Sequence, residues 1–321
     1  MPRNAADSNR MRTYIFGPVP SRRLGISLGV DLTPTKTCSF DCLYCQLSKT
    51  RFHTSERKEF CSPDEVIAEL KEVLGEIAAP DWITISGTGE PTLHSGLGYI
   101  LAEIKKINSA PCCVITNSSL IYLPEVRQEL MLADRLLPTL STVSQQTFTR
   151  IHRPTPDLQL NKILEGLRIF IHEFTGSVEI EIFVCPGVND TDEEIKNLRN
   201  YLMTLDRLES VYLNAAVRMP LDSEIKTADQ NRLNAFRTKL NLSIPVTTAF
   251  EHNLVPPRMS NWNRPAVSSD ILKLLLRHPC SEQQLERVLG SAPEKLRELL
   301  NELSMAGKVK KTANDCWTLV E

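Results

Sequence analysis

The amino-acid sequence predicts an α/β fold, in which strands and helices alternate around one mostly parallel sheet. In the middle of the chain, short runs rich in β-branched and apolar residues alternate with amphipathic stretches, which is the pattern of βα units. The hydrophobic fraction of 41% and the charged fraction of 24% are those of a globular protein. No apolar run approaches the ~18–20 residues that cross a bilayer, so a membrane protein is not expected.

Six segments are predicted to be strands of an open, partial (β/α)6 barrel. Their alternation with helices favours such a barrel over a β-sandwich. Because parallel α/β folds bind ligands at the carboxyl ends of their strands, the residues that follow each strand are candidate site residues. The predicted strands are 26–32, 82–86, 112–116, 136–141, 178–185 and 210–217, and the predicted helices are 64–78, 98–107, 124–133, 157–174, 192–206 and 227–239.

Two helix starts carry capping signals. Ser62 is expected to cap the first helix, with Pro63 in its first turn and Glu65 completing a capping box. Residues 189–191, Asn-Asp-Thr, precede an acidic first turn that starts at Asp192, so we expect them to cap the helix at 192–206.

The sequence changes in composition after His252. A segment rich in Pro and Asn is predicted to be a linker. It is followed by three short helical patterns, at 270–277, 281–289 and 293–306, and two strand-like segments, at 308–311 and 316–320. Three helices and a β-ribbon are the outline of a small winged-helix-like domain. The predicted division is therefore a flexible N-terminus (1–13), a core (14–253), a linker (254–265) and a winged-helix-like domain (266–321).

Charge argues against DNA binding by this C-terminal domain. The third helical pattern, 293–306, has a net charge of −1, so it would repel a phosphate backbone. Only Lys308, Lys310 and Lys311 of the ribbon would attract the phosphate groups of DNA. We expect a role in docking a protein or substrate, or as a lid.

The net charge of −2 is unevenly distributed. Residues 1–60 carry ten Lys and Arg against five Asp and Glu, whereas residues 61–265 carry 19 against 26. The basic start could meet an anionic cofactor or substrate, although a solvated surface is the simpler interpretation. Its cations include Arg10, Arg12, Arg22, Arg23, Arg51, Arg57 and Lys58.

The nine cysteines need an explanation. The first residues, MPRNAADSNRMRTY, contain no apolar segment, so no secretory signal is expected. We therefore expect reduced thiols and a cytoplasmic location, and an odd number also argues against a framework of disulfides.

Three of these cysteines, Cys38, Cys42 and Cys45, lie close enough in the sequence to converge on one metal centre. Thiolates suit zinc or iron–sulfur clusters. A closed zinc site needs four ligands, and neither a second CxxC nor a nearby pair of histidines supplies the fourth. Three thiolates on a four-iron cluster would leave one iron open for another ligand.

This loop resembles the CxxxCxΦC loop of the radical S-adenosylmethionine (SAM) enzymes, with Tyr44 as the aromatic residue before the last cysteine. After the second predicted strand, Gly87-Thr88-Gly89-Glu90 resembles the family's "GGE" turn. The resemblance spans roughly residues 14–250. Segments 16–25 and 36–38 resemble a largely uncharacterised branch of iron–sulfur proteins related to the tRNA wyosine-synthesis enzymes.

The resemblance implies a radical SAM barrel with a [4Fe–4S] cluster held by Cys38, Cys42 and Cys45. SAM would chelate the open iron and be cleaved reductively to a 5′-deoxyadenosyl radical, which abstracts hydrogen from an unidentified substrate. Gly87 and Gly89 would let the backbone approach the ligand closely, and Glu90 would accept a hydrogen bond from the SAM amino group.

The resemblance also implies a reductant such as a flavodoxin or a ferredoxin. RNA is one candidate substrate, and no membrane partner is expected. Two alternatives remain. A wyosine-type tRNA-modifying enzyme would carry extra cysteines for an auxiliary cluster, but no cysteine precedes Cys38. An iron–sulfur or zinc DNA-binding regulator is disfavoured by the charge of 293–306.

Further candidate residues follow the later strands. Asn117 and Ser141 are predicted to contact SAM together with Tyr44, although a turn role explains Asn117 almost as well. Glu179 and Glu181 are two residues apart on one strand, so their side chains face the same side of the sheet. There they would bind the SAM ribose or the substrate. In the other interpretation they form ion pairs or face solvent. The sequence assigns no catalytic residue. The loop 152–154 could face the substrate or pack against the protein. Asn214 and Arg218 lie at the end of the sixth strand. The remaining cysteines show no spacing typical of a cluster site: Cys61, Cys112, Cys113, Cys185, Cys280 and Cys316.

Overall fold

A computed structural model gives the structure of the chain. It describes residues 13–21, 23–45, 47, 49–215, 226–251, 267–277, 280–312 and 316–320. The predicted flexible N-terminus, apart from Thr13, and the predicted linker lie outside these residues, as do Arg10, Arg12, Arg22 and Arg218. None of the described helices is both long enough and apolar enough to cross a membrane.

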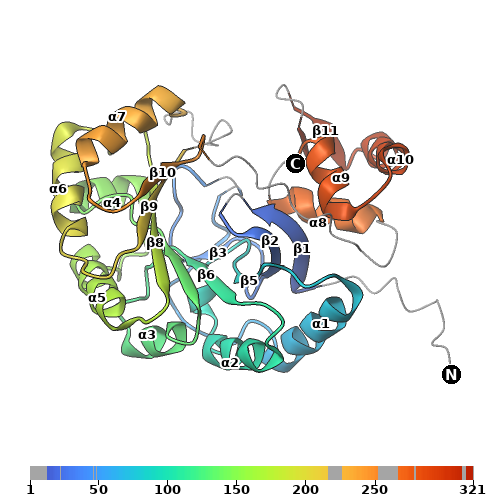
Figure 1. The fold of residues 1–321 in the computed structure, drawn as a ribbon, viewed down its shortest axis with the longest axis horizontal. Coiled ribbons are helices and arrows are strands. Elements are labelled where there is room, and N and C mark those ends of the chain that lie inside the picture. Colours follow the sequence, from blue (N-terminus) through green and yellow to red (C-terminus); the bar gives the residue numbers. More distant parts are fainter. Residues whose placement is uncertain are drawn as a thin grey trace.

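One eight-stranded sheet forms the centre of the molecule, in the order β1-β2-β5-β6-β7-β8-β9-β10 (Figure 1). Strand β1 (Ile15–Ser21) is antiparallel to β2, and every other pairing in this sheet is parallel. The predicted α/β fold is therefore confirmed. The six predicted strands correspond to β2 (Gly25–Val30), β5 (Trp82–Ile85), β6 (Cys112–Thr116), β7 (Arg135–Pro138), β8 (Ser177–Phe183) and β9 (Ser210–Asn214).

Helices line the outer side of the curved sheet, as Figure 1 shows for α1, α2, α3, α5 and α6. Six helices lie close to the predicted ranges. They are α1 (Pro63–Glu76), α2 (Leu97–Ile107), α3 (Pro124–Leu130), α5 (Leu160–Glu173), α6 (Asp192–Leu202) and α7 (Gln230–Leu240). The sequence does not predict six further elements that the structure contains: β1, β10 (Val246–Thr248), α4 (Gln145–His152), the short 3-10 helix η1 (Pro91–Leu93) and the two-residue strands β3 (Thr37–Cys38) and β4 (Phe52–His53).

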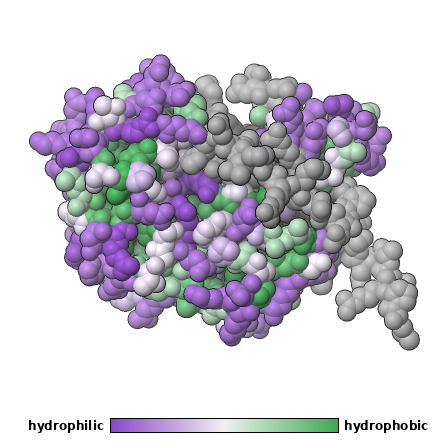
Figure 2. Space-filling model, in the orientation of Figure 1, coloured by the Kyte–Doolittle hydropathy of each residue, from purple (hydrophilic) through white to green (hydrophobic). Residues whose placement is uncertain are grey.

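Alternation along the strands separates a face that packs in the main core from a face of mixed polarity. Leu28 and Val30 of β2, like Ile83 and Ile85 of β5, are fully buried in the main core with side chains of the helices. The alternate residues Ser27 and Thr84 point the other way and share a hydrogen bond of 2.6 Å. Since neighbouring side chains on a strand face opposite sides, the helices cover the face of Leu28 and Val30, and the opposite face combines polar side chains with a small apolar cluster that includes Cys113 and Leu137. Figure 2 shows mainly hydrophilic groups over α6 and α7, outside this core.

The helix starts only partly follow their capping signals. Pro63 lies in the first turn of α1, but Ser62 makes no side-chain capping bond, so the predicted capping box is wrong. The Glu65 carboxylate instead accepts a hydrogen bond from the Tyr14 hydroxyl at 3.0 Å. The predicted cap of α6 is confirmed, because Thr191 Oγ1 accepts a hydrogen bond from the Glu194 amide.

The C-terminal residues form three helices and a two-stranded antiparallel ribbon. These elements are α8 (Ser268–Arg277), α9 (Glu282–Leu289), α10 (Pro293–Met305), β11 (Val309–Lys311) and β12 (Trp317–Leu319). They have a hydrophobic core of their own, to which Ile271, Leu285, Leu300 and Trp317 contribute.

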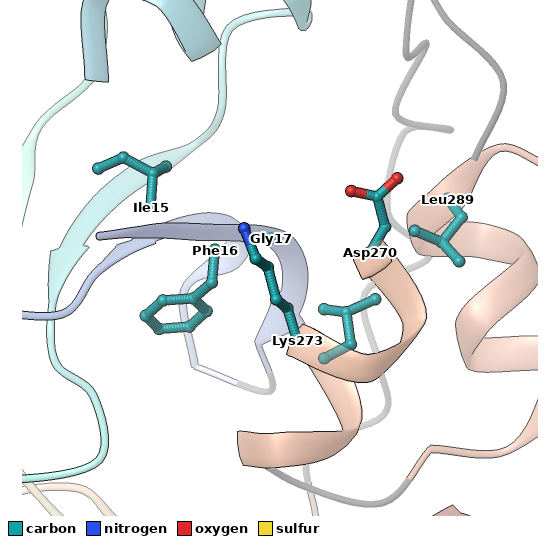
Figure 3. A pocket seen from close by; sticks show the side chains of 7 residues that line it. Ile15, Phe16, Gly17, Asp270, Lys273 and Leu289 are labelled. Carbon is teal, nitrogen blue, oxygen red and sulfur yellow. The ribbon is translucent and has the colours of Figure 1, made fainter. Parts of the chain in front are cut away.

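This C-terminal unit packs on β1, the edge strand of the large sheet. Val19 of β1 packs against the core of the unit. Figure 3 shows the pocket where the two parts meet, with Phe16 and Gly17 on β1 facing Lys273 of α8 and Leu289 of α9. The unit thus covers one edge of the sheet.

Candidate functional site

The cysteine loop follows β2 at the carboxyl edge of the sheet. Within it, β3 pairs in parallel with β4, which sets Cys38 opposite His53. The carbonyl oxygen of Thr37 accepts a hydrogen bond of 3.0 Å from the amide of Glu90, which follows β5. The structure therefore brings together the two motifs that the sequence separates, the cysteine loop and the turn at 87–90.

Each of the three cysteine sulfurs has a polar side chain as its neighbour. None of the cysteines forms a disulfide, and all three are partly exposed. N–H groups close to sulfur stabilise thiolates and tune the clusters that they bind. The contacts are Asn117 Nδ2 to Cys38 Sγ at 3.4 Å, His152 Nδ1 to Cys42 Sγ at 3.3 Å, and Lys36 Nζ to Cys45 Sγ at 3.0 Å.

The protein environment alone keeps two of these thiols protonated. Burial raises the pKa of Cys38 to about 12, and the ammonium of Lys36 only partly opposes it. Burial also raises the pKa of Cys42 well above its ordinary value. A metal that binds thiolates displaces such protons, so these cysteines suit a metal better than they suit a free nucleophile.

The donor set of three thiolates is compatible with an iron–sulfur cluster. In the part of the chain that the structure describes, no three His, Cys, Asp or Glu side chains are arranged to hold a single metal ion. A closed tetrahedral zinc site would need four close ligands. Three sulfurs on one loop, each with its own polar neighbour, match three cysteine ligands of a larger cluster.

Gly87 and Gly89 are needed for close packing within the protein. A Cβ on Gly87 would lie 2.1 Å from the Asp31 carboxylate, and one on Gly89 would lie 2.1 Å from the Thr37 carbonyl oxygen. The missing side chains therefore let the turn at 87–90 lie directly against the cysteine loop. Contact of these glycines with SAM stays a prediction.

Glu90 is a buried carboxylate that ties two strand ends together. It is 2% exposed. Its Oε1 accepts hydrogen bonds from the amide and hydroxyl of Thr92 and from the hydroxyl of Thr116, and its Oε2 accepts one of 2.7 Å from the Asn117 amide. Burial raises the pKa of Glu90, and these hydrogen bonds oppose the rise. The carboxylate thus joins the turn after β5 to the end of β6.

The other predicted contacts of SAM also surround the cysteine loop. Asn117 donates to Ser39 Oγ at 3.0 Å as well as to Cys38. The ring of Tyr44 stacks on Phe183 at the end of β8, with 3.9 Å between centroids. Ser141 Oγ accepts a hydrogen bond from the Phe183 amide. The residues predicted from the sequence therefore lie along one edge of the sheet.

The contacts of His152 with Cys42 and of Lys36 with Cys45 were not predicted from the sequence. His152 closes α4 and packs against the rings of Phe40 and Phe148, and its Nδ1 lies 3.4 Å from the Tyr44 hydroxyl. Burial lowers the pKa of His152 to about 3, so the imidazole is neutral. The sequence left this loop open between a substrate and a packing role, because nothing in it relates His152 to a cysteine 110 residues away.

Glu179 and Glu181 form ion pairs, as one of their two interpretations predicted. Arg23 lies 3.6 Å from Glu179 and 3.0 Å from Glu181, and Arg135 lies 3.5 Å from Glu179. Asn214 Nδ2 donates to Glu181 at 2.6 Å. Cys112, Cys113 and Cys185 are buried, as predicted for core residues, and all nine cysteines are free.

Comparisons with known proteins give the family. A sequence model of the radical SAM superfamily matches residues 32–199. The chain is 32% identical to the UPF0026 protein of Methanocaldococcus jannaschii over 310 residues, which is 94% of each chain. It is also 32% identical over 311 residues, or 96% of its length, to a protein named GTPase Obg from Brachyspira hyodysenteriae, of which it spans 45%.

A solved structure shares the fold. A radical SAM methyltransferase from Sphaerobacter thermophilus superposes with a TM-score of 0.51 at 18% identity, over 69% of this chain and 65% of that one. The family model covers the cysteine loop and the strands around it, more than half of the sequence, and this chain therefore belongs to the radical SAM superfamily and is an enzyme.

Proposed function

We propose that this protein binds a [4Fe–4S] cluster through Cys38, Cys42 and Cys45 and binds SAM beside it. A reduced cluster held by these cysteines would supply one electron for the cleavage of SAM to methionine and a 5′-deoxyadenosyl radical, and this radical would abstract hydrogen from the substrate. The observation that carries the proposal is that the cysteine loop, in which each of the three sulfurs has a polar neighbour, lies against the turn at 87–90 at one edge of the sheet.

The chain's own residues would orient SAM. Oε1 of Glu90 already accepts three hydrogen bonds, whereas Oε2 accepts one. Since a carboxylate oxygen has two lone pairs, the SAM amino group would find its acceptor at Oε2. Gly87, Gly89, Asn117, Tyr44 and Ser141 are proposed to line the remainder of the SAM site.

The proposed partner is a one-electron reductant of the flavodoxin or ferredoxin type. A cluster and reduced thiols need a reducing compartment, so we propose a cytoplasmic location. The substrate is unidentified. Modification of tRNA of the wyosine type is the alternative, and retention of tRNA on the purified protein, released by salt, would support it.

The proposed domain division is a radical SAM core at 14–253 and a winged-helix-like domain at 266–321. The observed three helices and ribbon support this outline. Helix α10 has Glu294, Glu298 and Glu302 along with Lys295 and Arg297, which disfavours a phosphate backbone. We propose that this domain docks a protein or substrate.

The test is anaerobic reconstitution with iron and sulfide, followed by reduction in the presence of SAM. We expect the absorption of a [4Fe–4S] cluster and release of 5′-deoxyadenosine. Cys42→Ala should lose both. Cys316→Ala, which changes a cysteine of the C-terminal ribbon, is the matched control and should keep both. A Cys42→Ala protein that retained the cluster and the cleavage would contradict the proposal.

A further inference from the structure

Lys36 is a buried lysine with an unusual backbone conformation. It is 5% exposed and has a φ of 61°, a left-handed conformation that a lysine rarely adopts. Its amide donates to the Thr88 carbonyl at 3.2 Å, and its carbonyl accepts from the amides of Arg51 and Phe52 at 2.9 and 3.0 Å. These backbone hydrogen bonds thus fix the position of the Lys36 backbone and the direction in which its side chain begins.

The side chain of Lys36 ends at a cysteine sulfur. Its Nζ lies 3.0 Å from Cys45 Sγ. Within the described ranges, no carboxylate forms an ion pair with this ammonium. A buried charge is costly unless an opposite charge lies beside it. A cysteine-ligated cluster would place the negative charge of the Cys45 thiolate directly beside this ammonium.

We propose that Lys36 is a positioning residue whose positive charge sets the reduction potential of the cysteine-ligated site. The inference rests on the proposed function, because it requires the cluster. One electron enters from an external one-electron reductant, no bond forms or breaks, and the site gains one negative charge. Lys36 offsets that charge through Cys45, and its removal therefore favours the oxidised form.

The experiment is a potentiometric titration of the reconstituted protein, followed by the electron paramagnetic resonance signal of the reduced cluster. We expect Lys36→Met to shift the equilibrium about tenfold towards the oxidised form, which is 59 mV for a one-electron couple. Lys36→Arg, which keeps the charge, should stay near the wild type. Lys71→Met removes an exposed lysine from α1 and is the control for a charge change far from the loop.

An unchanged potential in Lys36→Met, within the difference shown by Lys71→Met, would overturn the inference. If Lys36→Met does not hold the cluster, Lys36→Gln and Lys36→Arg decide. The role of charge is supported if Lys36→Arg keeps the cluster, or the wild-type potential, and Lys36→Gln does not. A wild-type potential in Lys36→Gln overturns it. A wild-type protein without a cluster contradicts the proposed function itself, whereas a cluster that is insensitive to Lys36 contradicts only this inference.

Discussion

His94 is a buried histidine whose hydrogen bonds fix its protonation state. It is fully buried where η1 ends. Its Nδ1 accepts a hydrogen bond from the Gly96 amide at 2.9 Å, so the proton lies on Nε2, which donates to the Cys61 carbonyl at 3.0 Å. Burial lowers the pKa of His94 below its ordinary value. Protonation would break the bond from Gly96.

This arrangement predicts that His94 makes the stability of the folded protein decrease at acidic pH. Between the lowered folded pKa and the unfolded pKa of about 6.5, only the unfolded chain binds the proton, so stability falls as the pH falls. His94→Asn keeps an acceptor for Gly96 and cannot be protonated. Urea unfolding at about pH 7.5 and about pH 5.5 should show a smaller loss of stability in the variant than in the wild type. Equal losses in both proteins would contradict the assignment.

At the scale of elements, the contact between the cysteine loop and the turn after β5 organises the site. The Glu90 amide donates to the Thr37 carbonyl, and Gly89 leaves no room for a Cβ beside the same carbonyl. The positions of Cys38 and of the residues after β5 are therefore coupled through one backbone contact. This coupling makes the glycine essential even where it touches no ligand.

Gly89→Ala should accordingly destabilise the protein by about 1–3 kcal/mol, since its Cβ would lie 2.1 Å from the Thr37 carbonyl oxygen. It should also lower the amount of cluster that reconstitution delivers. Gly75→Ala is the matched control, because a Cβ on this residue of α1 meets nothing within 4 Å. Helix propensity should make that variant more stable by about 0.5–1 kcal/mol. Thermal unfolding measures both, and an unaffected Gly89→Ala protein would show that the contact can relax.

The elements also show what sequence patterns can predict. All six strands with a buried apolar run were predicted, because alternation and β-branched residues persist over several positions. Strand β1 was missed because Gly17, Pro18 and Pro20 resemble a loop, and β10 because it has only three residues. In the site, spacing indicated the three cysteines. The roles of Lys36 and His152 depend on tertiary contacts with single atoms, for which the sequence carries no periodic signal.

At the scale of the whole molecule, the large sheet has two edges and one of them is covered. An exposed edge strand offers unpaired backbone groups to other chains. The C-terminal unit packs on β1 through α8 and α9, with Val19 joining its core. The cysteine loop lies at the carboxyl edge of the strands and not at β1. The C-terminal unit therefore does not cover β4, whose residues Phe52 and His53 are exposed.

That exposed surface is the region where we expect the reductant to bind. It consists of Lys49, Arg51, Phe52 and His53, whose side chains are all exposed. The Arg51 guanidinium lies 5.8 Å from the centre of the Phe52 ring. His53 pairs with Cys38 in the β3–β4 ribbon, and its Nε2 lies 3.1 Å from the Ser39 carbonyl oxygen. A basic and aromatic surface directly behind Cys38, a proposed cluster ligand, suits an acidic electron-donor protein.

The double variant Lys49→Glu and Arg51→Glu should therefore slow reduction of the cluster by reduced flavodoxin about tenfold or more at low ionic strength. Added salt should slow the wild type towards the variant, because it screens the attraction. Reduction by dithionite should be the same in both, since a small reductant needs no docking surface. Lys162→Glu, a charge reversal on an exposed lysine of α5, controls for net charge and should remain close to the wild type. Stopped-flow absorbance of the cluster follows each reaction, and a double variant that flavodoxin reduces at the wild-type rate would place the docking surface elsewhere on the molecule.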